Sequence, residues 1–129
     1  MRKQYSFVPA PSGYDAWDVD LLIERAAQLP VTEVAIDEIR ELDEVYWFGE
    51  SGIAATVRVM VEHARLIREA DLRYPIILGA DGRVMDGMHR VARALLDGRA
   101  TIAARRFAVD PPPDHRGVQP SDLDYPEDA

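Results

Sequence analysis

The chain has 129 residues, of which 47% are hydrophobic and none is cysteine. This composition suffices for one globular domain and excludes disulfides, thiolate zinc sites and cysteine nucleophiles. The chain has no run of 18 apolar residues and no apolar signal-peptide segment near its start, which predicts a cytoplasmic protein without a membrane span. The formal net charge of −8 disfavours DNA as a partner.

The charge is distributed unevenly along the chain. Residues 110–129 hold six acids and one arginine, which gives this segment a charge of −5. Residues 83–106 reverse the sign, because six arginines there face only two aspartates. A locally basic region inside an acidic protein favours a small anionic ligand over a long polyanion.

The first part of the chain predicts a short helix followed by a strand. Residues 1–14 contain two prolines and a glycine, and we expect an irregular lead-in there. A helix follows, with Asp15 or Asp18 as its capping acid. Residues 31–36 alternate apolar and polar side chains, which is typical of a half-buried strand, and residues 37–39 predict a helical turn.

The middle of the chain combines an aromatic segment with the longest predicted helix. Residues 41–50 contain acids and three consecutive aromatics, and we expect the aromatics to fill the core. A helix over 54–70 places His63 at the edge of its polar face, where it is interpreted as an ordinary surface histidine. Met60 is interpreted as a core filler. The stripe that we expect this helix to bury consists of Val57, Met60, Val61, Ala64 and Ile67.

The last part of the domain predicts two strands, a helix and a closing strand. The strands cover 75–78 and 83–85, the helix 87–97 and the final strand 101–109. The inner face of this helix is predicted from Met88, Val91, Ala92 and Leu95. These elements indicate one α/β (α+β) domain over 15–109, in which helices pack on a small mixed sheet. A flexible, acidic, proline-rich tail is predicted for 110–129.

The segment Asp86-Gly87-Met88-His89-Arg90 contains the clearest functional signal. It places an acid, a glycine, a histidine and an arginine where a strand ends and a helix begins. Backbone amides at a helix N-terminus have no intrahelical partner and favour anions. The segment therefore predicts a phosphate-binding corner.

The order of these elements resembles the ParB/sulfiredoxin superfamily over roughly residues 31–108. The segment 86–90 is similar to the Asp-Gly-His-His-Arg motif of the free-serine kinase branch and to the Gly-Cys-His-Arg motif of sulfiredoxins. In this superfamily the corner binds the phosphates of ATP or CTP. The resemblance therefore implies a nucleotide site with Mg²⁺, at which Gly87, Met88, His89 and Arg90 contact the phosphates.

The resemblance also implies catalytic carboxylates. Asp86 matches an active-site aspartate of the serine-kinase branch, where it could hold Mg²⁺ or orient a hydroxyl nucleophile beside His89. As an equal alternative, Asp86 is a plain helix N-cap. An upstream glutamate of that branch corresponds to one of Glu41, Asp43 and Glu44, which could act as a general base. The alternative is that these three acids are solvated.

One departure from the motifs limits the chemistry. Met88 replaces the sulfiredoxin cysteine, which excludes that reaction, and it also replaces a histidine of the serine-kinase branch.

Two functions are therefore weighed equally. The first is a nucleotide-dependent phosphotransferase or hydrolase acting on a small hydroxyl-bearing substrate. The second is a non-catalytic ligand-sensing or protein-interaction module, in which a homo-oligomer or a protein partner fits. DNA binding or nuclease activity is disfavoured.

Overall fold

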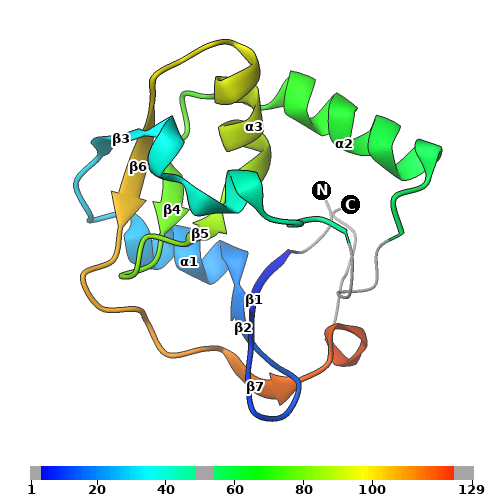
Figure 1. Cartoon of the computed structure of the whole chain (residues 1–129). Helices are drawn as coiled ribbons and strands as arrows, with labels where there is room; N and C mark the ends of the chain where they lie inside the picture. The colour runs from blue at the N-terminus through cyan, green and yellow to red at the C-terminus, as the bar shows by residue number, and fades with distance from the viewer. Residues whose placement is uncertain (1–3, 49–53, 124–129) are drawn as a thin grey trace.

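Two small β-sheets and three helices make up the computed structural model, which describes residues 4–48 and 54–123 (Figure 1). The single mixed α+β domain that the sequence predicts is confirmed. In chain order the helices and strands are β1 (Tyr5–Pro9), β2 (Tyr14–Asp18), α1 (Val19–Ala26), β3 (Thr32–Ala35), α2 (Val57–Glu69), β4 (Ile76–Leu78), β5 (Val84–Asp86), α3 (Met88–Leu96), β6 (Thr101–Arg106) and β7 (His115–Val118). Short 3-10 helices cover Ile36–Glu38, Arg40–Asp43 and Pro120–Asp122.

The larger sheet has the strand order β3-β6-β4-β5. Strand β6 pairs with β3 antiparallel and with β4 parallel, and β4 and β5 form an antiparallel hairpin. Both faces of β4 are buried, because Ile76 and Leu78 pack with α3 whereas Ile77 packs with α1 and Trp17. The sheet therefore lies between α3 on one face and α1 with β2 on the other.

The N-terminal segment forms strands instead of the predicted irregular lead-in. Strands β1 and β2 pair antiparallel over their whole length, and the two prolines lie at the end of β1 and in the turn. Proline is compatible with such positions because neither needs a ladder hydrogen bond from its nitrogen. Aromatic contacts hold the hairpin, as the ring centroids of Phe7 and Tyr14 lie 6.0 Å apart. Asp18 caps α1, and Asp15 lies in β2.

The segment predicted as a flexible tail lies along the domain up to β7. Asp114 accepts a hydrogen bond from the amide of Asp18 and pairs with Arg25 at 3.0 Å. Strand β7 then pairs with β2 and completes the smaller sheet. The segment is ordered because its acids bond to specific donors, which a count of prolines and acids does not reveal. Residues 124–129 of the predicted tail lie outside the described residues.

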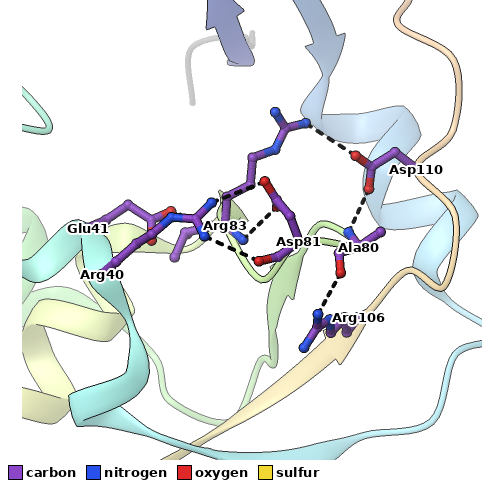
Figure 2. A network of polar contacts seen from close by, with 8 residues as sticks. Arg40, Glu41, Ala80, Asp81, Arg83, Arg106 and Asp110 are labelled. Atoms are coloured by element: carbon purple, nitrogen blue, oxygen red, sulfur yellow. Dashed lines mark hydrogen bonds and ion pairs between the residues drawn. The ribbon is translucent and has the colours of Figure 1, made fainter.

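A polar network fixes the turn that leads into β5 (Figure 2). Asp110 accepts a hydrogen bond of 2.7 Å from the amide of Ala80, whose carbonyl accepts one from Arg106. On the other side of the turn, Arg40 pairs with Asp81 at 3.1 Å. Segments from three parts of the chain therefore position the strand that ends at the candidate site.

Helix α2 lies on the outside of the domain, and none of its residues is buried. Its predicted apolar stripe is present, but Val57, Met60 and Val61 are 79%, 54% and 61% exposed. The prediction that these residues enter the core, with Met60 as a filler, is therefore wrong. On α3, Met88 and Val91 are buried as predicted, whereas Leu95 is 50% exposed. Helical periodicity identifies an apolar face but not the element that covers it.

Across residues 4–48 and 54–123, every helix is too short or too polar to cross a lipid bilayer.

Candidate functional site

The candidate site begins where β5 ends and α3 starts. Gly87 is the N-cap of α3, with a left-handed φ of 108°, and no side chain caps the helix. The alternative in which Asp86 is a plain N-cap is therefore wrong. The first turn of α3 presents backbone amides, including those of Met88 and His89, for which the structure shows no side-chain cap. Such an uncapped start is suited to an anion.

The requirement for glycine at position 87 arises inside the protein. A Cβ atom there would lie 2.7 Å from Cγ2 of Ile76 and 2.9 Å from Nη2 of Arg90. The positive φ adds strain for any other residue type. The side chain of Met88 also points inward and is buried, so only the backbone of this residue remains for a ligand.

Asp86 and Arg90 form an ion pair one helical turn apart. The Oδ2 atom of Asp86 lies 2.8 Å from Nη2 of Arg90, and the two side chains are only 14% and 17% exposed. The Nη1 atom of Arg90 donates to the carbonyls of Tyr74 and Pro75. Both terminal nitrogens of Arg90, which was predicted to bind phosphate, thus have partners within the protein. The ion pair also neutralises Asp86, the carboxylate that was predicted to bind Mg²⁺.

The three candidate acids of the preceding segment have different surroundings. Asp43 and Glu44 are exposed to solvent, whereas Glu41 is only 6% exposed. The Oε2 atom of Glu41 accepts a short hydrogen bond from the amide of Val84. Its Oε1 atom is buried and has no hydrogen-bond partner among the described residues. Glu41 therefore places a carboxylate on the free edge of β5, two residues before Asp86.

The charges of Glu41 and Asp86 both act on the hydroxyl of Tyr46. Although 40% of this residue is exposed, burial around its hydroxyl raises its pKa to about 12, and the charges of Glu41 and Asp86 act in the same direction. Arg83 opposes them with a smaller effect. The hydroxyl stays protonated at neutral pH and can donate a hydrogen bond. Tyr46 is a site residue that its sequence pattern, one of three consecutive aromatics, did not indicate.

Two histidines meet beside the start of α3. Nδ1 of His63, on α2, lies 2.8 Å from Nε2 of His89, on α3, with the rings inclined by 20°. The ring of Trp47 stacks on both, with centroid distances of 4.6 Å to His63 and 4.5 Å to His89. We name Trp47, His63 and His89 the aromatic triad. The interpretation of His63 as an ordinary surface residue is wrong.

The aromatic triad keeps its histidines neutral. Burial lowers the pKa of His63, and burial together with His63 lowers the pKa of His89 to about 4. A neutral pair can share one N–H between its facing nitrogens. Val59, His63 and Ile67 lie four residues apart on the partly buried side of α2, but this spacing does not identify His89 as the partner of His63.

The donor set offers little for a tightly held metal. Within residues 4–48 and 54–123, no group of three or more histidine or acidic side chains could hold a metal ion. Mg²⁺ needs few protein ligands when phosphates supply the others. Glu41 and Asp86 would therefore be better suited to a Mg²⁺ ion that is already coordinated by a nucleotide than to a metal ion that the protein alone holds.

Comparison of the chain with known protein families, with curated proteins and with solved structures finds no match. The resemblance to the ParB/sulfiredoxin superfamily stays a prediction.

Proposed function

We propose that this corner binds the phosphates of a nucleotide, ATP or CTP with Mg²⁺, and transfers a phosphoryl group to a small hydroxyl-bearing substrate or to water. The observation that carries the proposal is the uncapped start of α3 beside a buried carboxylate with a free oxygen. An anion would accept hydrogen bonds from the amides of Met88 and His89. The ParB/sulfiredoxin resemblance supports the same ligand.

The charges around the start of α3 favour a phosphate that is bound together with Mg²⁺. Glu41 and Asp86 act together on the Tyr46 hydroxyl, and without compensation both carboxylates would repel a phosphate. Arg90 already offsets Asp86. A Mg²⁺ ion on the nucleotide would offset Glu41 and would lower the cost of bringing phosphate oxygens near it.

Glu41 is the best placed of the three acids to act as a general base. Its buried Oε1 atom could accept the proton of an attacking hydroxyl or water, while Oε2 stays bonded to the amide of Val84. The Tyr46 hydroxyl could donate a hydrogen bond to a phosphate oxygen. Asp43 and Glu44 are too exposed to supply the same environment.

The ion pair between Asp86 and Arg90 favours a second candidate, a non-catalytic nucleotide-binding module. In this function the pair is a structural support, and neither residue reaches the ligand. The buried side chain of Met88, where the serine-kinase branch has a histidine, fits the same candidate. Nucleotide that is bound yet unconsumed over hours would identify it.

Isothermal titration of the whole chain with ATP and CTP, each with Mg²⁺, tests the binding. The matched variants are His89→Glu and His89→Gln, which remove the same imidazole and differ in charge. We expect His89→Gln to retain binding within about tenfold. His89→Glu should abolish it, because a carboxylate in the first turn competes for the same amides. The proposal fails if the wild type binds neither nucleotide at millimolar concentration, or if both variants bind equally.

Nucleotide turnover with a panel of small hydroxyl compounds separates the two candidates. We expect Glu41→Gln to retain nucleotide binding and to lose at least about a hundredfold in rate, as for removal of a general base. The matched control is Glu44→Gln, which changes an exposed acid nearby and should leave the rate unchanged. Wild-type binding without turnover would select the non-catalytic module.

A further inference from the structure

The outward face of α2 carries apolar side chains that the domain does not cover. Val57, Met60 and Val61 are 79%, 54% and 61% exposed, and Ala64 is exposed beside them. We name these four residues the α2 stripe. They lie at helical spacing on one side of a helix that projects along the outside of the molecule (Figure 1). A contiguous apolar face of this kind marks an interaction surface.

The polar flank of the α2 stripe has an alternating charge pattern. Arg58, Glu62, Arg65 and Glu69 follow one another along this flank, and their signs read plus, minus, plus, minus. Arg65 pairs with both glutamates within the helix, at 2.7 and 3.3 Å, and its side chain and theirs remain about half exposed. Read from Glu69 back to Arg58, the signs are minus, plus, minus, plus. An antiparallel copy of this flank therefore places opposite charges against each other.

We propose that the α2 stripe is the interface of an antiparallel homodimer of this chain. In such a pair equivalent flanks face each other, as in antiparallel coiled coils. With the two-fold axis between His63 and Ala64, Arg58 faces Glu69 of the second copy and Glu62 faces Arg65. The same axis places the two copies of Ala64 beside each other, and this small side chain permits close approach of the helices. The opposite flank of α2 faces its own domain through His63 and Ile67, so the two domains lie on the same side of the helix pair.

The oligomeric state of the whole chain, followed by light scattering over a concentration series, is the first test. We expect the wild type to reach twice the mass of the chain and Val61→Glu to remain monomeric. The matched control is Ile23→Glu, which alters a 51% exposed aliphatic residue on α1 and should dimerise like the wild type. A wild type that stays monomeric at every concentration overturns the proposal and leaves the stripe to a different protein. Equal dimerisation of Val61→Glu and the wild type overturns it as well.

Charge exchange tests the complementarity of the flank. The double variant Arg58→Glu/Arg65→Glu has an all-acidic flank, and Glu62→Arg/Glu69→Arg has an all-basic one. Each should be monomeric alone because like charges would face each other, whereas their equimolar mixture should form heterodimers at least as well as the wild type. Circular dichroism of each variant alone checks that α2 is retained. A mixture that stays monomeric contradicts the pairing.

Single cysteines determine the direction of the helices, since the natural chain contains none. In the antiparallel pair, equivalent 64 positions are offset by roughly 1.5 Å along the helix direction and equivalent 57 positions by roughly 20 Å. A disulfide requires Cα atoms within about 7 Å. Ala64→Cys should therefore cross-link readily and Val57→Cys should not. Cross-linking of both variants would indicate a parallel pair and overturn the proposed arrangement.

Discussion

Nδ1 of His63 and Nε2 of His89 lie 2.8 Å apart, and this contact joins the outer helix α2 to the first turn of α3. A second polar contact between the helices, from Arg93 to the carbonyl of Arg68, lies at the opposite end of α3. The position of α2 is therefore coupled to the backbone amides of the candidate site.

The histidine pair makes stability depend on pH. The pKa of His89 is about 4 in the folded chain, against an ordinary value of 6.5, so the unfolded chain binds more protons between these values. Stability is therefore complete above about pH 6.5 and falls as the pH decreases toward 4. From pH 7 to pH 5 we expect a loss of about 2 kcal/mol in urea unfolding. In His89→Gln most of this loss should be absent. An equal loss in wild type and variant would assign the effect to other groups.

Removal of the indole should return His89 toward its ordinary behaviour. Burial is the main cause of its lowered pKa, and Trp47 stacks on its ring at 4.5 Å. We expect Trp47→Ala to admit water and to raise the pKa of His89 well above 4, as measured by NMR titration of the imidazole protons. Trp47→Phe preserves a stacked ring and should give a smaller rise. An unchanged pKa in Trp47→Ala would show that other groups bury His89.

The ion pair at the start of α3 should be a structural support. Arg90→Ala removes two carbonyl contacts and leaves Asp86, which is 14% exposed, without its partner. We expect a loss of about 3 kcal/mol in the free energy of unfolding. In an Asp86→Asn background the same change should cost less, because no charge is left unpaired. Additive costs would show that the pair has no coupling energy.

Gly87 and Gly82 offer a matched comparison of backbone strain and crowding. Both have positive φ angles, of 108° and 88°, but a Cβ atom at Gly82 would meet nothing within 4 Å. Gly82→Ala should cost about 1 kcal/mol from conformation alone. Gly87→Ala adds the contact with Ile76 and should cost at least about 2 kcal/mol more. Thermal unfolding measures both. Equal costs would mean that β4 yields to the added methyl group.

Glu41 should contribute to the raised pKa of Tyr46 through its charge. We expect Glu41→Gln to lower this pKa below its value of about 12, while the part due to burial remains. The amide oxygen of glutamine can still accept the hydrogen bond from Val84, so the fold should be retained. Tyrosinate absorbance during an alkaline titration provides the measurement, and the control is Glu44→Gln. Identical titrations of Glu41→Gln and the wild type would contradict the expected proximity.

The local pattern of the chain predicted most of the fold. The strands at 32–35, 76–78 and 84–86 and the helices α2 and α3 occur where periodicity indicated, because each carries its own apolar pattern. The smaller sheet was missed, since its strands β1 and β7 contain or adjoin prolines and glycines and are defined by their pairing with β2. Such pairing depends on residues far apart in the sequence.

The candidate site was predicted only where its residues are close in sequence. Residues 86–90 form a strand end and a helix start, and local turn chemistry suffices to place them. The aromatic triad combines the 41–48 segment, α2 and α3, and no local pattern indicates that His63 meets His89. Glu41 is buried whereas Asp43 and Glu44 are exposed, because Glu41 alone of the three accepts the hydrogen bond from the amide of Val84. The sequence shows only three nearby acids and does not indicate which of them makes this contact.

The pairing of β7 with β2 has a consequence for biosynthesis. Asp114 and Asp18, which join the two strands, are 96 positions apart. The β1–β2 hairpin is synthesised before β7, and the open edge of β2 acquires this neighbour only when residues 115–118 have been made. Until then the nascent protein presents an unpaired strand flanked by aromatic rings, a structure prone to intermolecular association. Ribosomal stalling before residues 115–118 are made should therefore yield aggregation-prone chains, whereas chains that include β7 protect that edge themselves.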